Sequence, residues 1–142
     1  GINHYFSNWL TIQNNFPKII KQDLPKTDRG WIVYPDGFRD ILLKVTDEYG
    51  KMPIYIMENG AAYPDTISDD SMVHDPLRVE YYRSYIRSLH EAIIHGVEVK
   101  GYFAWSLLDN FEWEEGYSSR FGIVYVDYKT QKRIIKDSGK FY

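Results

Sequence analysis

Side chains that can do chemistry gather where the apolar runs of this sequence end. Glu58 follows the run PIYIM, Tyr5 follows the opening residues, and the segment WSLLDNFEW supplies Trp105, Glu112 and Trp113. In α/β proteins, reactive groups collect where strands lead into the following loops. A carboxylate flanked by aromatic residues needs polar partners, and ligand hydroxyls are one source of them. These segments therefore predict one site built from a tyrosine, two carboxylates and two tryptophans.

Each of these residues also has a purely structural interpretation. Asn59-Gly60 is a strong turn dipeptide, so Glu58 could be a solvated residue before a turn. The residues after Gly60 do not resume an alternating strand, however, and a simple hairpin fits them poorly. Trp105 and Trp113 are more often core residues than platforms for a sugar. Spacing and residue type alone leave both interpretations open.

Two amphipathic helices are expected to position these residues. The first begins near Pro35 and ends at Gly50, and the second begins at Asp75-Pro76 and ends at Gly96. Apolar residues at helical spacing predict the buried face of each helix. In the first helix they are Phe38, Ile41, Leu42, Val45 and Tyr49, and in the second Val79, Tyr82, Ile86, Leu89 and Ile93.

Three apolar segments, GINHYF, PIYIM and VKGYFAWSLL, are predicted strands that alternate with the two helices. This order is typical of an α/β fold with a parallel sheet, and the continuous apolarity of PIYIM predicts a strand covered on both faces. Residues 7–33 have no clear period and are predicted to form a long connection. Residues 121–138 predict a short hairpin with its turn near 129–131, followed by a further helix.

Size and composition narrow the classes of function. The chain has 142 residues, enough for one domain spanning 1–142, and it is 44% hydrophobic and 17% aromatic. A net charge of -3 and a pI near 5.8 make nucleic acid an unexpected partner. No apolar run approaches the roughly 20 residues that cross a bilayer, so no membrane partner is expected. The absence of cysteine favours a cytoplasmic protein. His90 and His95 do not share a helical face, so we expect no metal and no cofactor.

Several motifs resemble those of glycoside hydrolase family 1. YIMENG resembles the strand-end motif that carries the nucleophile in this family, and GYFAWSLLDNFEWEEGYSSRFGIVYVDY resembles its eighth strand and the segment after it. GINHYF is similar to its sixth strand, GWIVYPDGF to its Trp-x-Ile-x-Pro-x-Gly segment, and KDSGKFY to the entry of its last helix. The resemblance runs nearly end to end and favours Glu58 as a functional residue over the turn interpretation.

The resemblance implies a role for each candidate residue in retaining hydrolysis of β-linked glycosides. Glu58 would be the nucleophile, and Tyr5 would orient it through a hydrogen bond. The expected substrate-binding residues are Asn3 behind the nucleophile, Trp31 on the aglycone side, Trp105 under the glycone ring, Glu112 and Trp113 at its 4- and 6-hydroxyls, and Phe121 in the pocket wall.

The family fold is a (β/α)8 TIM barrel, which needs about 250 residues. The resemblance therefore implies the C-terminal portion of that barrel, strands 6 to 8, and the opening residues are interpreted as an internal strand. The Asn-Glu-Pro motif that carries the general acid/base does not occur in the sequence. We expect the chain to be inactive alone and to need a complementary N-terminal fragment with strands 1 to 5. A carbohydrate-binding or structural fragment without activity is the alternative.

Departures from the family pattern bear on the substrate. Met57 replaces the usual Thr or Ser before the nucleophile, and His4 replaces the first tyrosine of a Tyr-Tyr pair, while Tyr5 is retained. The branch of the family that cleaves phosphorylated sugars usually lacks Glu112, whose charge would repel a 6-phosphate. We therefore expect an unphosphorylated β-glucoside, β-galactoside or β-fucoside as the substrate.

Overall fold

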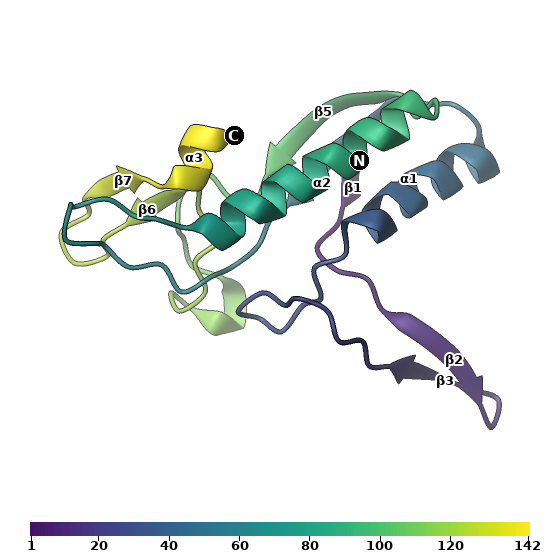
Figure 1. Ribbon diagram of the computed structural model, residues 1–142, viewed down its shortest axis with the longest axis horizontal. Helices are drawn as coiled ribbons and strands as arrows, with labels where there is room; N and C mark the ends of the chain where they lie inside the picture. The colour runs from purple at the N-terminus through teal and green to yellow at the C-terminus, as the bar shows by residue number, and fades with distance from the viewer.

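A computed structural model describes residues 1–142. The chain folds into a parallel sheet covered by helices, with two hairpins outside the sheet (Figure 1). The elements in chain order are β1 (Ile2–Asn3), β2 (Trp9–Gln13), β3 (Phe16–Ile20), α1 (Pro35–Tyr49), β4 (Ile54–Asn59), α2 (Pro76–Ile94), β5 (Val99–Ala104), the 3-10 helix η1 (Trp113–Glu115), β6 (Val124–Val126), β7 (Arg133–Ile135) and α3 (Asp137–Phe141).

The central sheet confirms the predicted parallel arrangement. Its strand order is β1-β4-β5, and both pairs of neighbours run parallel. Asn3 of β1 pairs with Glu58 of β4, and Asn59 of β4 pairs with Ala104 of β5. β1 has only two residues, so the strand predicted from GINHYF is mostly irregular in the structure. The carboxyl ends of all three strands meet at one edge of the sheet, which is where a site can form.

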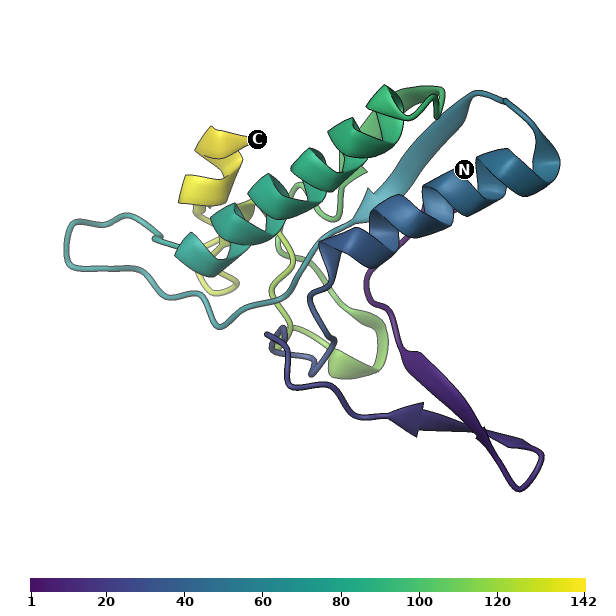
Figure 2. The ribbon, with the colours of Figure 1, turned by 45° about the vertical axis from the view of Figure 1, so that its right-hand side comes forward.

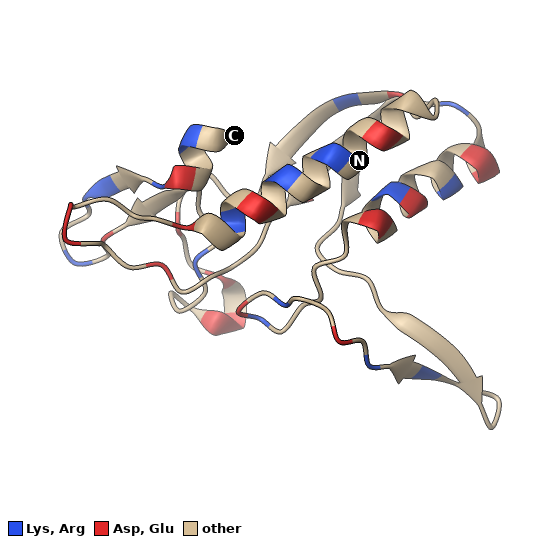
Figure 3. Ribbon diagram, in the orientation of Figure 1, with Lys and Arg blue, Asp and Glu red and all other residues tan.

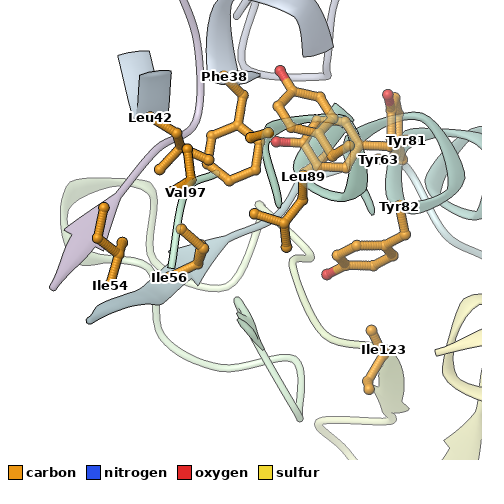
Figure 4. Packing of buried hydrophobic residues seen from close by; sticks show 13 residues of the cluster. Phe38, Leu42, Ile54, Ile56, Tyr63, Tyr81, Tyr82, Leu89, Val97 and Ile123 are labelled. Carbon is orange, nitrogen blue, oxygen red and sulfur yellow. The ribbon is translucent and has the colours of Figure 1, made fainter. Parts of the chain in front are cut away.

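The two long helices lie side by side and cover one face of the sheet (Figure 2). α1 begins at Pro35 and ends before Gly50, and α2 begins at Pro76, as predicted. The contacts between helices and sheet form a single core (Figure 4). It is built from the fully or nearly fully buried side chains of Phe38, Leu42, Ile54, Ile56, Tyr81, Tyr82, Tyr85 and Leu89.

The predicted buried faces of the helices are only partly right. Ile41 and Tyr49 of α1 are exposed, and Ile93 of α2 is exposed as well. In α2 the buried face includes Tyr81 and Tyr85, which the predicted face left out. Their rings stack on each other with centroids 4.2 Å apart. Tyrosine contributes a large apolar ring to a core when its hydroxyl finds a partner, so hydrophobicity alone misplaced this face.

The other face of the sheet is open, and we call it the inner face. Tyr55 and Met57 of β4 and Phe103 of β5 point to this face and are 44%, 49% and 52% exposed. The prediction that β4 is covered on both faces is therefore wrong for this chain. Apolar side chains exposed together on a sheet mark a surface that another layer covers.

Two antiparallel hairpins lie outside the sheet. β6 and β7 form the hairpin predicted near residues 129–131. β2 and β3 form a second hairpin inside the segment predicted to be a long connection, so that prediction is wrong. This hairpin extends away from the rest of the molecule (Figure 1), and Lys18 is its only charged residue (Figure 3). None of the helices is both long and apolar enough to span a membrane.

Candidate active site

The candidate site lies at the carboxyl ends of the three parallel strands. The backbone N–H of His4 donates to the Glu58 carbonyl oxygen at 3.0 Å, and the Trp105 N–H donates to the Asn59 carbonyl oxygen at 2.9 Å. These bonds continue the ladder past the last paired residues of β1 and β5. The side chains of Tyr5, Glu58 and Trp105 therefore emerge at one edge, as the positions of the three strand ends predict.

Tyr5 and Glu58 form the central contact of the site. The Tyr5 hydroxyl donates a hydrogen bond of 2.7 Å to Oε2 of Glu58, and both residues are half-buried. Burial raises the pKa of Tyr5 well above its usual value, and the hydrogen bond to Glu58 raises that pKa further. The phenol therefore stays protonated across the ordinary pH range and keeps its hydrogen for the bond to Glu58. This is the hydrogen bond that the resemblance implies.

Asn59 and Gly60 do not form a turn, and they fix the end of β4 instead. The Asn59 side chain is fully buried and donates to the His4 carbonyl oxygen at 2.6 Å and to the Tyr81 hydroxyl at 3.0 Å. A Cβ on Gly60 would lie 1.8 Å from the Trp105 carbonyl oxygen, so only glycine allows the two strand ends to approach this closely. The turn interpretation of this dipeptide is therefore wrong, and the backbone at Glu58 is held on both sides.

Trp105 and Glu112 lie together on the loop that follows β5. Nε1–H of Trp105 donates to Oε2 of Glu112 at 3.4 Å, and both side chains are half-buried. Glu112 also contributes to raising the pKa of Tyr5, after burial and Glu58, so its charge acts on the central contact of the site. Because the indole supplies one polar partner, Glu112 keeps acceptor capacity for other donors.

Aromatic rings line one side of Tyr5. The ring centroids of Tyr5 and Trp31 lie 5.4 Å apart, those of Tyr5 and Phe121 6.2 Å, and those of Trp31 and Phe121 6.0 Å. Phe121 is buried, while Trp31 is half-buried. Three segments far apart in the sequence thus supply one apolar wall beside the Glu58 carboxylate.

A hollow of about 490 Å³ lies next to this wall. It is lined by Arg29, Trp31, Glu112, Trp113 and Glu114. Trp113 is 83% exposed and makes no ring contact with the other candidate residues. A larger hollow, of about 560 Å³, lies along the β2–β3 hairpin, away from the strand ends, and contains none of the candidate residues.

Two further residues refine the picture of the site. Asn3 is exposed next to Glu58 in the sheet, and its side chain makes no hydrogen bond in the structure. Sequence reasoning missed Arg29, whose guanidinium lies 5.0 Å from the centre of the Trp31 ring and pairs with Glu115 at 3.2 Å. The only sequence signal for Arg29 is its position two residues before a candidate tryptophan.

The arrangement holds a carboxylate beside an apolar wall, with a second carboxylate and indole rings nearby. Such a site suits a ligand that has both an apolar face and several hydroxyls. No group of three or more His, Cys, Asp or Glu side chains is placed so that it could hold a metal ion.

Comparisons with known proteins identify close relatives. The family described as Glycosyl hydrolase family 1 matches residues 3–142. β-Glucosidase A of Thermotoga maritima is 52% identical over 145 residues, and 6-phospho-β-galactosidase of Leptotrichia buccalis is 37% identical over 165 residues. The structure of β-glucosidase from Thermotoga maritima in complex with glucoimidazole superposes with a TM-score of 0.96 at 52% identity.

The overlap with these relatives is partial. The Thermotoga maritima matches cover 100% of this chain and 32% of the relative, so the chain spans about a third of the length of the curated proteins it matches. The superposition confirms that the chain is part of a TIM barrel of this kind. The covered percentages give the length of the overlap but not its position in the sequences of the relatives. The assignment of β1, β4 and β5 to strands 6 to 8 therefore stays a prediction.

Proposed function

The chain belongs to glycosyl hydrolase family 1, and on this basis we propose that it is a segment of a retaining β-glycosidase of the β-glucosidase type. Glu58 is the nucleophile of this proposal, and Tyr5 orients it. The observation that carries the proposal is the 2.7 Å hydrogen bond between the two, at the end of β4. A nucleophilic carboxylate must be rigid and ionised, and a protonated phenol beside it favours both conditions.

The remaining candidate residues bind the sugar in this proposal. Trp105 is the platform under the glycone ring, and Glu112 accepts hydrogen bonds from the 4- and 6-hydroxyls, with Trp113 at the same edge. The 3.4 Å hydrogen bond between Trp105 and Glu112 supports these roles, because it places the platform and the carboxylate side by side. Hydrogen bonds from sugar hydroxyls to a carboxylate are among the stronger kind. Phe121 lines the pocket wall, Trp31 lies on the aglycone side, and Asn3 lies behind the nucleophile.

An unphosphorylated β-glucoside, β-galactoside or β-fucoside is the proposed substrate. The charge of Glu112 disfavours a phosphate at the 6-position, because two like charges repel at close range. The sequence identities with the relatives favour the same substrate class. The Thermotoga maritima relative named β-glucosidase is 52% identical, whereas the Leptotrichia buccalis relative named 6-phospho-β-galactosidase is 37% identical.

Activity in this proposal requires a second part of the barrel. Retaining hydrolysis needs two carboxyl groups about 5–5.5 Å apart, one as nucleophile and one as general acid/base. Glu112 is assigned to the sugar, so the proton donor must come from the complementary part. The exposed Tyr55, Met57 and Phe103 on the inner face are the surface that such a part would cover. We place β1, β4 and β5 as strands 6 to 8 because the motifs occur in that order.

The proposal can be tested in a chimera. The chain replaces the C-terminal third of Thermotoga maritima β-glucosidase A, the place that the assignment to strands 6 to 8 gives it, and the product is assayed with 4-nitrophenyl β-D-glucoside. We expect turnover by the chimera, at least about 10⁴-fold less turnover after Glu58→Gln, and labelling of Glu58 by a 2-deoxy-2-fluoroglucoside. A folded chimera without activity, or labelling of another residue, would refute the proposal.

The place of the strands has its own test. A second chimera carries the chain in place of the N-terminal third of the same relative. We expect only the chimera with the chain at the C-terminal end to fold and turn over substrate. If only the N-terminal placement gives an active enzyme, the assignment to strands 6 to 8 is wrong, whereas the family membership is unaffected.

A further inference from the structure

A group of charged side chains, five of them buried, lies behind the candidate site and is not used by the proposed chemistry. We call it the charge cluster, and it contains three cations and three carboxylates. Its members are Arg78, Arg120, Lys136, Asp65, Asp75 and Asp109. Arg78 and Lys136 have no exposed surface. A buried charge is costly unless it is paired, and here the numbers of opposite charges match.

Lys136 joins the loop that follows Glu58 to the loop that carries Glu112. Its ammonium donates to Oδ2 of Asp65 at 2.5 Å and to Oδ1 of Asp109 at 2.8 Å. Asp65 lies on the loop that follows Glu58, and Asp109 lies three residues before Glu112. One side chain from the segment before α3 therefore links the loop after β4 with the loop after β5.

Arg78 strengthens the same link through backbone contacts. Its guanidinium donates to the Ala61 carbonyl oxygen at 3.0 Å and to the Arg120 carbonyl oxygen at 2.8 Å. Ala61 follows Gly60 at the end of β4, and Arg120 precedes Phe121 of the apolar wall. Arg78 also pairs with both oxygens of Asp65. Arg78 thus bonds to the backbone beside the site, and it shares Asp65 with Lys136.

Asp109 connects Lys136 to the backbone of the loop that follows β5. Its Oδ1 accepts the Gly122 backbone N–H at 2.9 Å in addition to Lys136, and its Oδ2 accepts Nη1 of Arg120 at 2.6 Å. Replacing buried ion pairs with apolar residues of similar size is often neutral or stabilising. Stability alone therefore does not account for this arrangement. Directional bonds from one ammonium to two loops instead fix the separation of those loops.

We infer that Lys136 is a positioning residue that sets the place of Glu112 relative to Glu58, and through it the discrimination between sugars with and without a 6-hydroxyl. The inference rests on the proposed function, because it takes Glu112 as the acceptor for that hydroxyl. Lys136 lies behind the loops, so it acts only through them. Its loss lets Asp109 and the following residues shift while the bond between Tyr5 and Glu58 remains.

The test compares two substrates in the chimera described above. They are 4-nitrophenyl β-D-glucoside and its 6-deoxy analogue, and the readout is the ratio of their kcat/KM values. We expect Lys136→Met to lower this ratio by about tenfold, the size of one lost hydrogen bond to a charged group. Lys140→Met is the matched control, because Lys140 is exposed on α3 and pairs only with Asp137, and we expect no change in the ratio.

A second variant covers the case in which Lys136→Met does not fold. Asp65→Asn combined with Lys136→Met removes one carboxylate with the cation, so the buried charges remain balanced while the bridge between the loops is absent. We expect the double variant to fold and to show the lowered ratio. An unchanged ratio in a folded variant would overturn the inference, and so would loss of folding in both variants, because the bridge would then serve the fold alone.

One further variant separates this inference from the proposed function. Glu112→Gln should lower the same ratio by a similar factor, and combining it with Lys136→Met should add little. If Glu112→Gln leaves the ratio unchanged, the assignment of Glu112 to the 6-hydroxyl fails. If Glu112→Gln lowers the ratio and Lys136→Met does not, only the positioning role of Lys136 fails.

Discussion

Replacing Tyr5 with phenylalanine removes a single oxygen from the candidate site and leaves its ring in place. The ring contacts with Trp31 and Phe121 should persist, because neither depends on the hydroxyl. The 2.7 Å hydrogen bond to Oε2 of Glu58 is lost. Any change in activity therefore reports on that bond and not on the packing of the apolar wall.

The size of the effect follows from the kind of bond. A hydrogen bond to a charged group contributes about 1.5–3 kcal/mol, and each ~1.4 kcal/mol of transition-state stabilisation is tenfold in rate. Tyr5→Phe should therefore lower kcat/KM of the chimera for 4-nitrophenyl β-D-glucoside by about 10- to 150-fold. The bond orients Glu58 for attack, so we expect most of the loss in kcat and little in KM.

The control for this experiment is Tyr49→Phe, a change of the same kind at an exposed position at the end of α1. It should leave both kinetic constants unchanged. The reasoning is refuted if Tyr5→Phe, folded as judged by circular dichroism, stays within about threefold of the parent in kcat/KM. A loss confined to KM would also contradict it, because Tyr5 would then bind substrate without orienting the nucleophile.

Three further predictions concern stability, measured by urea denaturation of the chimera. Leu42→Ala should cost about 2–5 kcal/mol because Leu42 is fully buried, whereas Ile41→Ala next to it, at an exposed position, should cost much less. Gly60→Ala should cost ~3 kcal/mol or more, because the new Cβ would lie 1.8 Å from a backbone oxygen, and a stable variant would show that the strand ends can separate. Hydrogen bonding to Asp137 raises the pKa of His74, so the folded chain binds the proton more tightly. The stabilisation is complete below about pH 6.5 and is lost as the pH rises through the raised pKa, and His74→Gln should abolish this dependence.

The sequence predicted the helices and the parallel order of the strands because these signals are local. Pro35 and Gly50 mark the ends of α1, and Pro76 marks the start of α2. Tyr5, Glu58 and Trp105 were found together because each follows an apolar run, and parallel strands bring such positions to one edge. Their identification with a glycosidase site came from the motifs, since spacing alone left a turn as an alternative for Glu58.

The β2–β3 hairpin was missed although a signal for it exists. Asn14 and Asn15 adopt φ of 53° and 64°, and consecutive residues with positive φ form the tight turn that suits a hairpin. Asparagine tolerates this conformation better than most residues. Pro17 lies within β3, and proline in sheets is confined to their edges. In a hairpin of two strands both are edges, so the proline is tolerated.

The links that Lys136 makes in the charge cluster had no sequence signal. Lys136 is 71 residues from Asp65 and 27 residues from Asp109, and no periodic pattern connects positions so far apart. Charged residues are usually expected at the surface, yet Arg78 lies four residues before Tyr82 on the buried face of α2. Only the folded chain brings these groups together, so the positioning inferred for Lys136 rests on contacts and not on composition.

The open inner face of the sheet bears on how the proposed barrel would be completed. The core contacts of α1 and α2 with β4 involve only residues of this chain, so this layer packs without the proposed complementary part. Tyr5 and Glu58 already meet in that state. Under the proposed function, the complementary part would bring the proton donor to a carboxylate that Tyr5 already holds, so completing the barrel and gaining activity would be one event.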